Sequence, residues 1–216
     1  MCGRYTLTTS EIDLSWLGIN KPVTQPPAYN IAPGEQVLVA RQSADSQLEA
    51  VRVKWGLVPP WLKDFSRAQI NARVETAASK PMFREAMSKR RCLVLADGWY
   101  DWQALPNGNQ PWYIRSRQPQ QVFVGIWERY VVDAHLSFDS CAILTVEALP
   151  SLKPLSDRMP VLADRETAKQ WLSGAIDHEQ LVAAMRKSQA GQLVHHPVSR
   201  AVNRVAEKRA VCVSRL

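Results

Sequence analysis

Residues 92–115 read CLVLADGWYDWQALPNGNQPWYIR, and this stretch predicts the fold. It begins with an apolar run, Cys92–Ala96, that is too short for a helix and suits a buried strand. Trp99–Trp102 is aromatic and strand-like, and Pro106-Asn107-Gly108-Asn109 is a strong hairpin signal. The chain then returns into a second strand at Pro111–Arg115. The middle of the chain therefore predicts antiparallel strands joined by a tight turn.

Strand patterns continue on both sides of this stretch. Further strands are predicted at Gln36–Arg41, Leu48–Trp55, Val122–Trp127 and Ser140–Val146. The clearest amphipathic helices are Glu166–Leu172 and His178–Met185. No flexible linker or change of composition divides the chain. We therefore predict one α+β domain over residues 1–216, with a large, mostly antiparallel sheet system and a few flanking helices.

Several shorter segments have weaker patterns. They predict a capped short helix at 10–14 that ends near Gly18, a Pro-rich irregular loop at 21–28, a turn at 29–34, a short helix at 82–89 and a closing apolar strand at 210–213. If residues 71–75 are extended, Asn71, Arg73 and Glu75 share one face of the strand, because side chains alternate along it.

The chain is basic and rich in tryptophan. Its 216 residues carry a net charge of +7, with 46% hydrophobic and 22% charged residues, which is typical of a globular protein. The positive charge favours a polyanionic partner. Eight tryptophans is a high count, and those that the core does not use can stack on nucleic-acid bases.

Cysteine spacing and hydropathy argue against several classes of protein. The four cysteines, at positions 2, 92, 141 and 212, are too far apart for a CxxC redox motif or a zinc ribbon. No apolar run has the length that spans a bilayer, and no signal peptide is visible. The adjacent His195 and His196 would point to opposite faces of a strand, which disfavours a metal site. We expect a cytoplasmic monomer with free thiols, no metal and no cofactor.

The first residues, Met1-Cys2-Gly3-Arg4-Tyr5, place a cysteine where removal of the initiator methionine would expose it. A terminal cysteine carries two nucleophiles, an amine and a thiol, with reference pKa values of about 8 and about 8.5. The amine can form an imine with an aldehyde, and the thiol can then close a five-membered thiazolidine. On these residues alone, the simpler interpretation is a small residue that opens a strand.

Seven short segments change that interpretation. They are MCGRY at 1–5, YNIAPG at 29–34, WGLVPPW at 55–61, INARVET at 70–76, ADGWYDW at 96–102, SDRMPV at 156–161 and HPVSRAV at 196–202. In this order they closely resemble the SRAP family of abasic-site processing proteins, over nearly the whole chain. The resemblance implies an α+β fold with a positively charged groove that passes the N-terminus.

The same resemblance implies an abasic-site sensor. Such a protein binds single-stranded DNA and forms a covalent thiazolidine crosslink between Cys2 and the ring-opened sugar aldehyde, through lyase-like Schiff-base chemistry. It also implies an autopeptidase activity that removes Met1. The DNA-bound protein would then be associated with the nucleoid.

The resemblance further implies roles for individual residues. The family's catalytic positions fall on Cys2, Asn71, Asp101 and Ser156. Its DNA-binding positions fall on Arg4, Asn30, Trp61, Arg73, Arg158, Ser199 and Arg200. Arginine suits this task because its planar fork donates two hydrogen bonds to one phosphate. The alternatives without DNA are a salt bridge of Arg73 with Glu75 and core packing of Trp61.

Two catalytic positions depart from the family pattern. Asp101 stands where the family has a glutamate, which shortens the reach of the carboxylate by about 1.5 Å. Ser156 stands where the family has a histidine, and serine cannot carry a proton near neutral pH. We expect slower proton transfer unless another group, such as His195 or His196, takes over.

Two other functions stay open. In the first, the departures have abolished crosslinking, and the protein is a non-crosslinking single-stranded DNA-binding module. In the second, the chain is an N-terminal-nucleophile hydrolase, because one class of glutamine amidotransferases also begins Met-Cys-Gly. However, the chain lacks the long synthetase domain of those enzymes, and the INARVET segment has no place in them.

Overall fold

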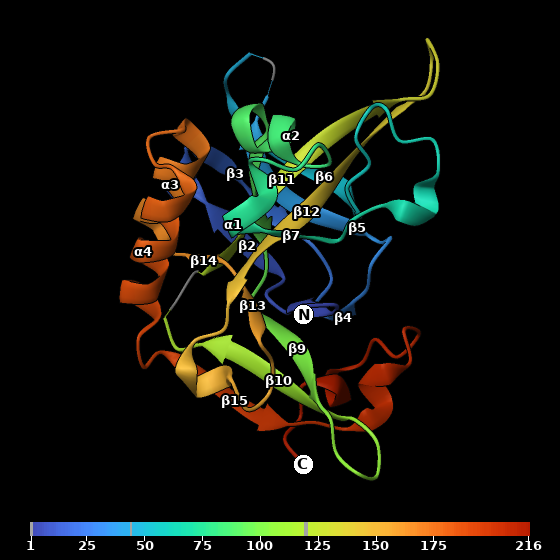
Figure 1. Cartoon of the computed structure of the whole chain (residues 1–216), viewed down its shortest axis with the longest axis vertical. Coiled ribbons are helices and arrows are strands. Elements are labelled where there is room, and N and C mark those ends of the chain that lie inside the picture. The colour runs from blue at the N-terminus through green and yellow to red at the C-terminus, as the bar shows by residue number, and fades with distance from the viewer. Residues whose placement is uncertain (1, 44, 119–120) are drawn as a thin grey trace.

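Two β-sheets build most of the molecule (Figure 1). The computed structural model describes residues 2–43, 45–118 and 121–216. The larger sheet contains β5 (Gln36–Gln42), β6 (Leu48–Trp55), β7 (Asn71–Arg73), β8 (Arg91–Leu95), β11 (Val122–Val131), β12 (Ser137–Glu147), β13 (Arg158–Pro160) and β14 (Leu162–Ala163). The smaller contains β1 (Tyr5–Leu7), β4 (Ala28–Ile31), β9 (Gly98–Gln103), β10 (Gln110–Ser116) and β15 (Leu193–Pro197).

The larger sheet closes on itself. Its strands run in the order β12-β6-β5-β8-β11, and β11 pairs back with β12, so these strands form a small barrel. The long strand β12 also pairs with β7 and β13 beyond the barrel. Among the described strands of both sheets, only the β12–β6 and β12–β7 pairs are parallel. The predicted α+β class with mostly antiparallel sheets is therefore confirmed.

The smaller sheet has the order β15-β10-β9-β1-β4 and packs on the barrel through aromatic rings. Tyr5 of β1 meets Trp55 of β6 edge-on at 5.1 Å and Phe123 of β11 at 5.8 Å between ring centroids. Trp99 of β9 meets Phe123 at 5.9 Å. All four side chains are buried. Because these contacts bury large apolar surfaces, they fix β1 and β9 against the barrel.

In the described ranges, four α-helices accompany the sheets: α1 (Val74–Ala77), α2 (Arg84–Lys89), α3 (Arg165–Ser173) and α4 (His178–Gln189). Helices α3 and α4 lie together along one side of the molecule, in orange in Figure 1. Asp164 caps α3 by accepting a hydrogen bond from the Thr167 amide at 2.9 Å, and Gly174 ends it in a left-handed conformation. Asp177 and Gln180 form a capping box on α4.

The segment from residue 10 to residue 28 differs from the prediction. A short helix at 10–14 is wrong: Glu11–Leu14 is strand β2, and only Ser15–Leu17 forms a helical turn, which ends at Gly18 as predicted. The irregular loop predicted at 21–28 is confined to residues 25–27, because β3 (Ile19–Thr24) pairs with β2 as a two-stranded ribbon. Pro22 is compatible with this strand because a ribbon has free edges that need no donor.

Three further segments depart from the sequence pattern. Residues 29–31 of the predicted turn belong to β4 (Ala28–Ile31), and the turn itself is confined to Pro33-Gly34. The extended conformation at 71–75 ends at Arg73, so Glu75 lies on α1 and shares no strand face with Asn71. Ala210–Cys212 is a 3-10 turn and not a closing strand.

Gly98 permits a close approach that no other residue would allow. An added Cβ would lie 2.3 Å from the hydroxyl oxygen of Tyr113 and 2.5 Å from its Cζ. The Tyr113 hydroxyl in turn shares a hydrogen bond with Thr6 Oγ1 at 3.0 Å. The absence of a side chain at position 98 thus lets β9 and β10 pack tightly beside β1.

We predict that Gly98→Ala lowers the free energy of unfolding by about 1–3 kcal/mol, because the new methyl group displaces the Tyr113 ring. Urea unfolding followed by circular dichroism measures the change. The same substitution in a Tyr113→Ala background should cost much less, because the ring is then absent. An equal cost in both backgrounds would contradict this explanation.

Candidate functional site

Cys2 lies at the end of β1, beside β9. Tyr5 pairs with Trp99 and Thr6 with Gly98, and the Tyr100 amide donates to the Arg4 carbonyl at 3.0 Å. Continued toward the N-terminus, this antiparallel register brings Cys2 and Gly3 alongside Asp101 and its neighbour. Cys2 is fully buried, with its sulfur 3.9 Å from the carbonyl oxygen of Arg4.

Asn71 reaches the same point from the larger sheet. It begins β7, and its Nδ2 donates a hydrogen bond to the Cys2 carbonyl at 2.8 Å. Its Oδ1 is buried and accepts no hydrogen bond from any described residue. A buried acceptor without a donor is costly, so this oxygen retains the capacity to accept a hydrogen bond.

Asp101 supplies the negative charge of the site. It lies on β9, is buried, and its Oδ1 accepts from the Trp102 amide at 3.0 Å. Burial raises the pKa of the Cys2 thiol, and the nearby charge of Asp101 raises it further. The structure thus brings together Cys2, Asn71 and Asp101, which were predicted from motifs about 70 and 100 residues away in sequence.

Ser156 shapes a turn. Its Oγ donates to the Arg158 carbonyl at 2.9 Å and lies 3.3 Å from the Arg158 amide, just before β13. Its hydroxyl therefore contacts the backbone of Arg158 and stabilises the turn. Its predicted catalytic part stays a prediction.

Glu75 binds Arg158 and not Arg73. The two guanidinium nitrogens of Arg158 donate to the two carboxylate oxygens of Glu75 at 2.9 and 2.8 Å, and one also donates to the Thr145 carbonyl at 2.6 Å. The alternative interpretation of Arg73, a salt bridge with Glu75, is therefore wrong. Arg73 is exposed, and no ion pair or hydrogen bond engages its side chain within the described chain. Its charge is available to a ligand.

Trp61 lies on the surface. Its side chain is 55% exposed, so the core-packing alternative is wrong. The loop that carries it is anchored by Phe65, whose ring meets Tyr130 at 5.0 Å and Phe138 at 5.8 Å on the β11–β12 hairpin. Sequence reasoning did not single out Phe65, because a lone aromatic residue in a loop gives no periodic signal.

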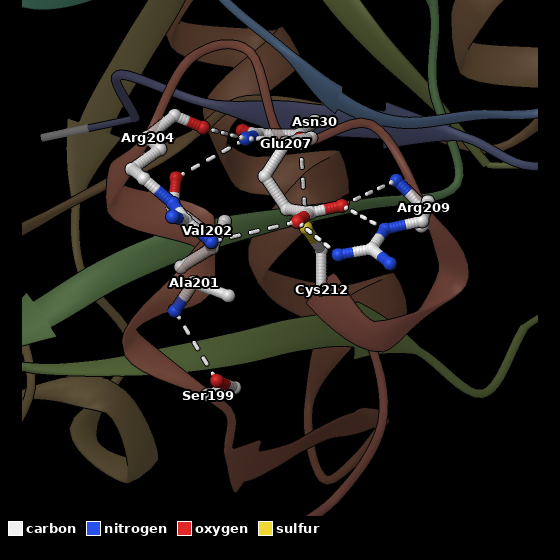
Figure 2. A network of polar contacts seen from close by, with 8 residues as sticks. All are labelled: Asn30, Ser199, Ala201, Val202, Arg204, Glu207, Arg209 and Cys212. Atoms are coloured by element: carbon white, nitrogen blue, oxygen red, sulfur yellow. Dashed lines mark hydrogen bonds and ion pairs between the residues drawn. The ribbon is translucent and has the colours of Figure 1, made fainter.

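Asn30 and Arg4 bind the C-terminal segment. Asn30 is fully buried, and Arg4 donates to its Oδ1 at 3.0 Å and to the Val202 carbonyl at 2.9 Å. Figure 2 shows Asn30 facing this segment, with Ser199 at the start of the turn that follows β15. Ser199 caps that turn by accepting from the Ala201 amide. The DNA contacts predicted for these residues stay predictions.

Arg200 lies at the hairpin turn between β9 and β10. It is exposed and donates to the Asn107 carbonyl at 3.2 Å. The contact is with backbone oxygen, so the positive charge of Arg200 is not neutralised by it.

The two histidines of β15 point to opposite faces, as expected. His196 pairs with Tyr113, which pairs with Tyr100, so it lies on the face of the sheet opposite Asp101. Its Nε2 lies 2.9 Å from the Val213 carbonyl. The ring of His195 packs against Trp112 at 5.4 Å. The geometry gives His196 no route to replace the histidine missing at position 156.

Other kinds of site receive no support. Among the described residues, no group of three or more His, Cys, Asp or Glu side chains could hold a metal ion. No helix in the described ranges is long and apolar enough to cross a membrane. A cavity of ≈ 790 Å³, lined in part by Asp97, Tyr113 and His196, includes none of Cys2, Asn71 and Asp101 in its wall.

Comparison with known proteins places these features in a family. Residues 1–205 match the SOS response associated peptidase (SRAP) family. The chain is 32% identical to the abasic site processing protein YoqW of Bacillus subtilis, over 94% of each chain. It is 31% identical to the abasic site processing protein YedK of Escherichia coli, over 97% of each chain.

Solved structures agree with the fold. A protein from Bacteroides thetaiotaomicron superposes with a TM-score of 0.79 over the full length of both chains, at 17% sequence identity. A phage-related protein from Bordetella bronchiseptica superposes with a TM-score of 0.73 at 28% identity, over 92% of this chain and 95% of that one. The sequence match and the shared fold agree, and the chain belongs to the SRAP family.

Proposed function

We propose that this protein is an abasic-site sensor that binds single-stranded DNA and crosslinks to it through Cys2 once Met1 has been removed. The observation that carries the proposal is the convergence of Cys2, Asn71 and Asp101 at the end of β1. The names of the relatives, abasic site processing proteins, support the same substrate. The proposed product is a thiazolidine.

The reaction would proceed in two additions. The neutral amine of Cys2 attacks the aldehyde carbon of the opened sugar, and loss of one water gives an imine. The thiol sulfur then adds to the imine carbon, and its proton ends on the nitrogen, which becomes a secondary amine in the five-membered ring. Ring closure removes the hydrolysable imine. Asn71, whose Nδ2 donates to the Cys2 carbonyl and whose Oδ1 accepts from no described residue, would accept a hydrogen bond from the amine through that oxygen.

Asp101 would move protons between these groups. Because burial raises the pKa of the Cys2 thiol, the thiolate population at neutral pH is smaller than that of a free cysteine. The thiol therefore needs a base at the moment of ring closure, and Asp101 is the carboxylate beside it. The same pair would serve the removal of Met1, in which the thiol attacks its own preceding peptide carbonyl and water completes the hydrolysis.

DNA would be held by charge and stacking. The net charge of +7 attracts the phosphates, and Arg73 offers a guanidinium without a protein partner in the described chain. Trp61 offers an exposed ring to a base next to the lesion. Arg158, Ser199 and Arg200 would complete the groove. The binding should weaken steeply with salt, because it releases counterions.

A non-crosslinking DNA-binding module is the second candidate. The hydroxyl of Ser156 is engaged in a hydrogen bond within the backbone turn before β13. The carboxylate of Asp101 has a shorter reach than that of the glutamate in the family. A protein with these two changes could keep its groove and lose its chemistry. Salt-sensitive binding of single strands without any adduct would favour this candidate.

We predict that Cys2→Ala abolishes the heat-resistant adduct with an abasic single-stranded oligonucleotide, because neither sulfur nor ring closure remains. Boiled samples on a denaturing gel measure it. Cys2→Ser is the matched control: once Met1 is absent, which mass spectrometry checks, both variants keep the α-amine, and either should give only an imine adduct that survives after borohydride reduction. An alanine variant that still forms an equally stable adduct would rule out the thiazolidine.

For Asp101→Asn, we predict crosslinking at least about 100-fold slower at neutral pH, because the amide cannot accept the thiol proton. The deficit should shrink as the pH rises toward about 9.5, because hydroxide can then take the thiol proton, and because the Asp101 charge that helps to raise the pKa of Cys2 is absent in the variant. Single-turnover rates at saturating DNA measure both effects. A wild-type rate at neutral pH would remove Asp101 from the mechanism.

We predict that Trp61→Ala weakens single-stranded DNA binding by about 1–3 kcal/mol, the usual value of one stacked base. The melting temperature should change little, because more than half of the side chain is exposed. Fluorescence anisotropy with undamaged oligonucleotide measures the affinity. Val131→Ala, at an apolar residue that is 61% exposed, is the control. Equal affinities for both variants would show that Trp61 does not stack on DNA.

A further inference from the structure

We propose that Arg4 and Asn30 are positioning residues, which tie the strand of Cys2 to the C-terminal segment 202–207 and so hold Cys2 in place beside Asp101. This inference rests on the proposed function. It differs from the phosphate contact that the family resemblance implies for Arg4 and Asn30. The argument starts from the contacts that these two side chains already make.

The guanidinium of Arg4 is largely committed within the protein. Its Nη1 has two N–H groups, and Nη1 donates at 3.0 Å to Asn30 Oδ1 and at 2.9 Å to the Val202 carbonyl. Its Nη2 lies 3.5 Å from the Asn203 carbonyl. A phosphate that used the Nη1–Nη2 edge would have to displace these acceptors. The contacts therefore favour a structural role for Arg4. We call the hydrogen bonds of Arg4 and Asn30 to the C-terminal segment the brace.

Asn30 holds the other side of this brace. It is fully buried on β4, next to β1 in the sheet. Its Nδ2 lies 3.1 Å from the carbonyls of Val202 and Arg204 and 2.9 Å from that of Glu207 (Figure 2). The amide nitrogen of Asn30 thus contacts three carbonyls of the C-terminal segment, while its amide oxygen accepts a hydrogen bond from Arg4. No atom of Asn30 is open to a DNA strand.

The same segment also binds the strand of Asp101. The indole nitrogen of Trp102, which follows Asp101, donates to Asn203 Oδ1 at 2.8 Å. Residues 202–207 therefore contact β1 through Arg4 and β9 through Trp102. A segment that bridges these two strands controls the distance between the nucleophile and its base. Small errors in that distance reduce rates strongly.

Ion pairs keep the segment curled. Glu207 accepts from Arg209 Nε at 2.7 Å and from its Nη2 at 2.6 Å, and Arg204 lies 3.7 Å away. These arginines, Arg209 foremost, lower the pKa of the Glu207 carboxyl to about 2. Lys208 Nζ donates to the Asn30 carbonyl at 2.6 Å. The family match ends at residue 205, so Glu207, Lys208 and Arg209 lie beyond it, whereas Arg204 lies within it.

The experiment separates positioning from phosphate contact. We would measure the affinity for undamaged single-stranded DNA at several salt concentrations, and the single-turnover crosslinking rate at saturating abasic DNA. Arg4→Ala and Asn30→Ala should keep the salt slope of wild type and crosslink about 10- to 100-fold more slowly. Their effects should not add in the double variant, because they remove one unit. Arg73→Ala is the comparator and should lower the salt slope by about 0.7.

A variant at the surface distinguishes a loss of positioning from a loss of folding. Asn203 is exposed, so Asn203→Ala should keep the wild-type melting temperature and salt slope and still crosslink more slowly. Arg4→Lys should recover part of the rate, because an ammonium can donate to both Asn30 and Val202. Two outcomes would overturn this inference and leave the proposed function standing. One is a reduced salt slope for Arg4→Ala with a normal crosslinking rate at saturating DNA. The other is a normal crosslinking rate for both Asn30→Ala and Asn203→Ala. A wild-type protein without any adduct would overturn the proposed function and this inference with it.

Discussion

The pairing of β1 with β9 is the contact on which the rest of the site depends. Tyr5 and Trp99 are paired across these strands. Both pack in the core against the phenyl ring of Phe123, which belongs to the barrel. Continued through residues 2–4, this register brings Cys2 close to Asp101, whose charge acts on the Cys2 thiol. A nucleophile on a strand end anchored in this way is held more precisely than one on a loop. The core packing of Tyr5 and Trp99 therefore also fixes the position of Cys2.

Burial sets the chemical character of the nucleophile. Reactive cysteines usually have a lowered pKa, whereas burial and the charge of Asp101 raise the pKa of Cys2. This environment keeps the thiol protonated and favours the amine as the first nucleophile. In the proposed reaction, the thiol would then act within the complex, with Asp101 as the base beside it. The two departures from the family pattern, Asp101 and Ser156, fall on groups that this reaction would use to move protons.

Much of the fold was predictable, and the motifs also pointed to Cys2, Asn71 and Asp101, which the structure brings together. Strands with strong patterns were predicted at 36–41 and 122–127, because apolar runs of that length bury well, and the structure extends them to Gln36–Gln42 and Val122–Val131. The ribbon of β2 and β3 was not, because its side chains are mostly exposed and Pro22 suggests a loop. Partners far apart in sequence were also beyond prediction: Glu75 meets Arg158, and Arg4 meets Val202. Local patterns carry no information on such pairs.

One measurement tests the central claim most directly. Purified protein is incubated with an abasic single-stranded oligonucleotide and digested with protease and nuclease, and the N-terminal peptide is sequenced by mass spectrometry. Our account predicts that Met1 is absent and that the mass of the sugar remnant, less one water, lies on Cys2, in a form that borohydride does not alter. An adduct on a lysine side chain, or on a chain that retains Met1, would contradict it.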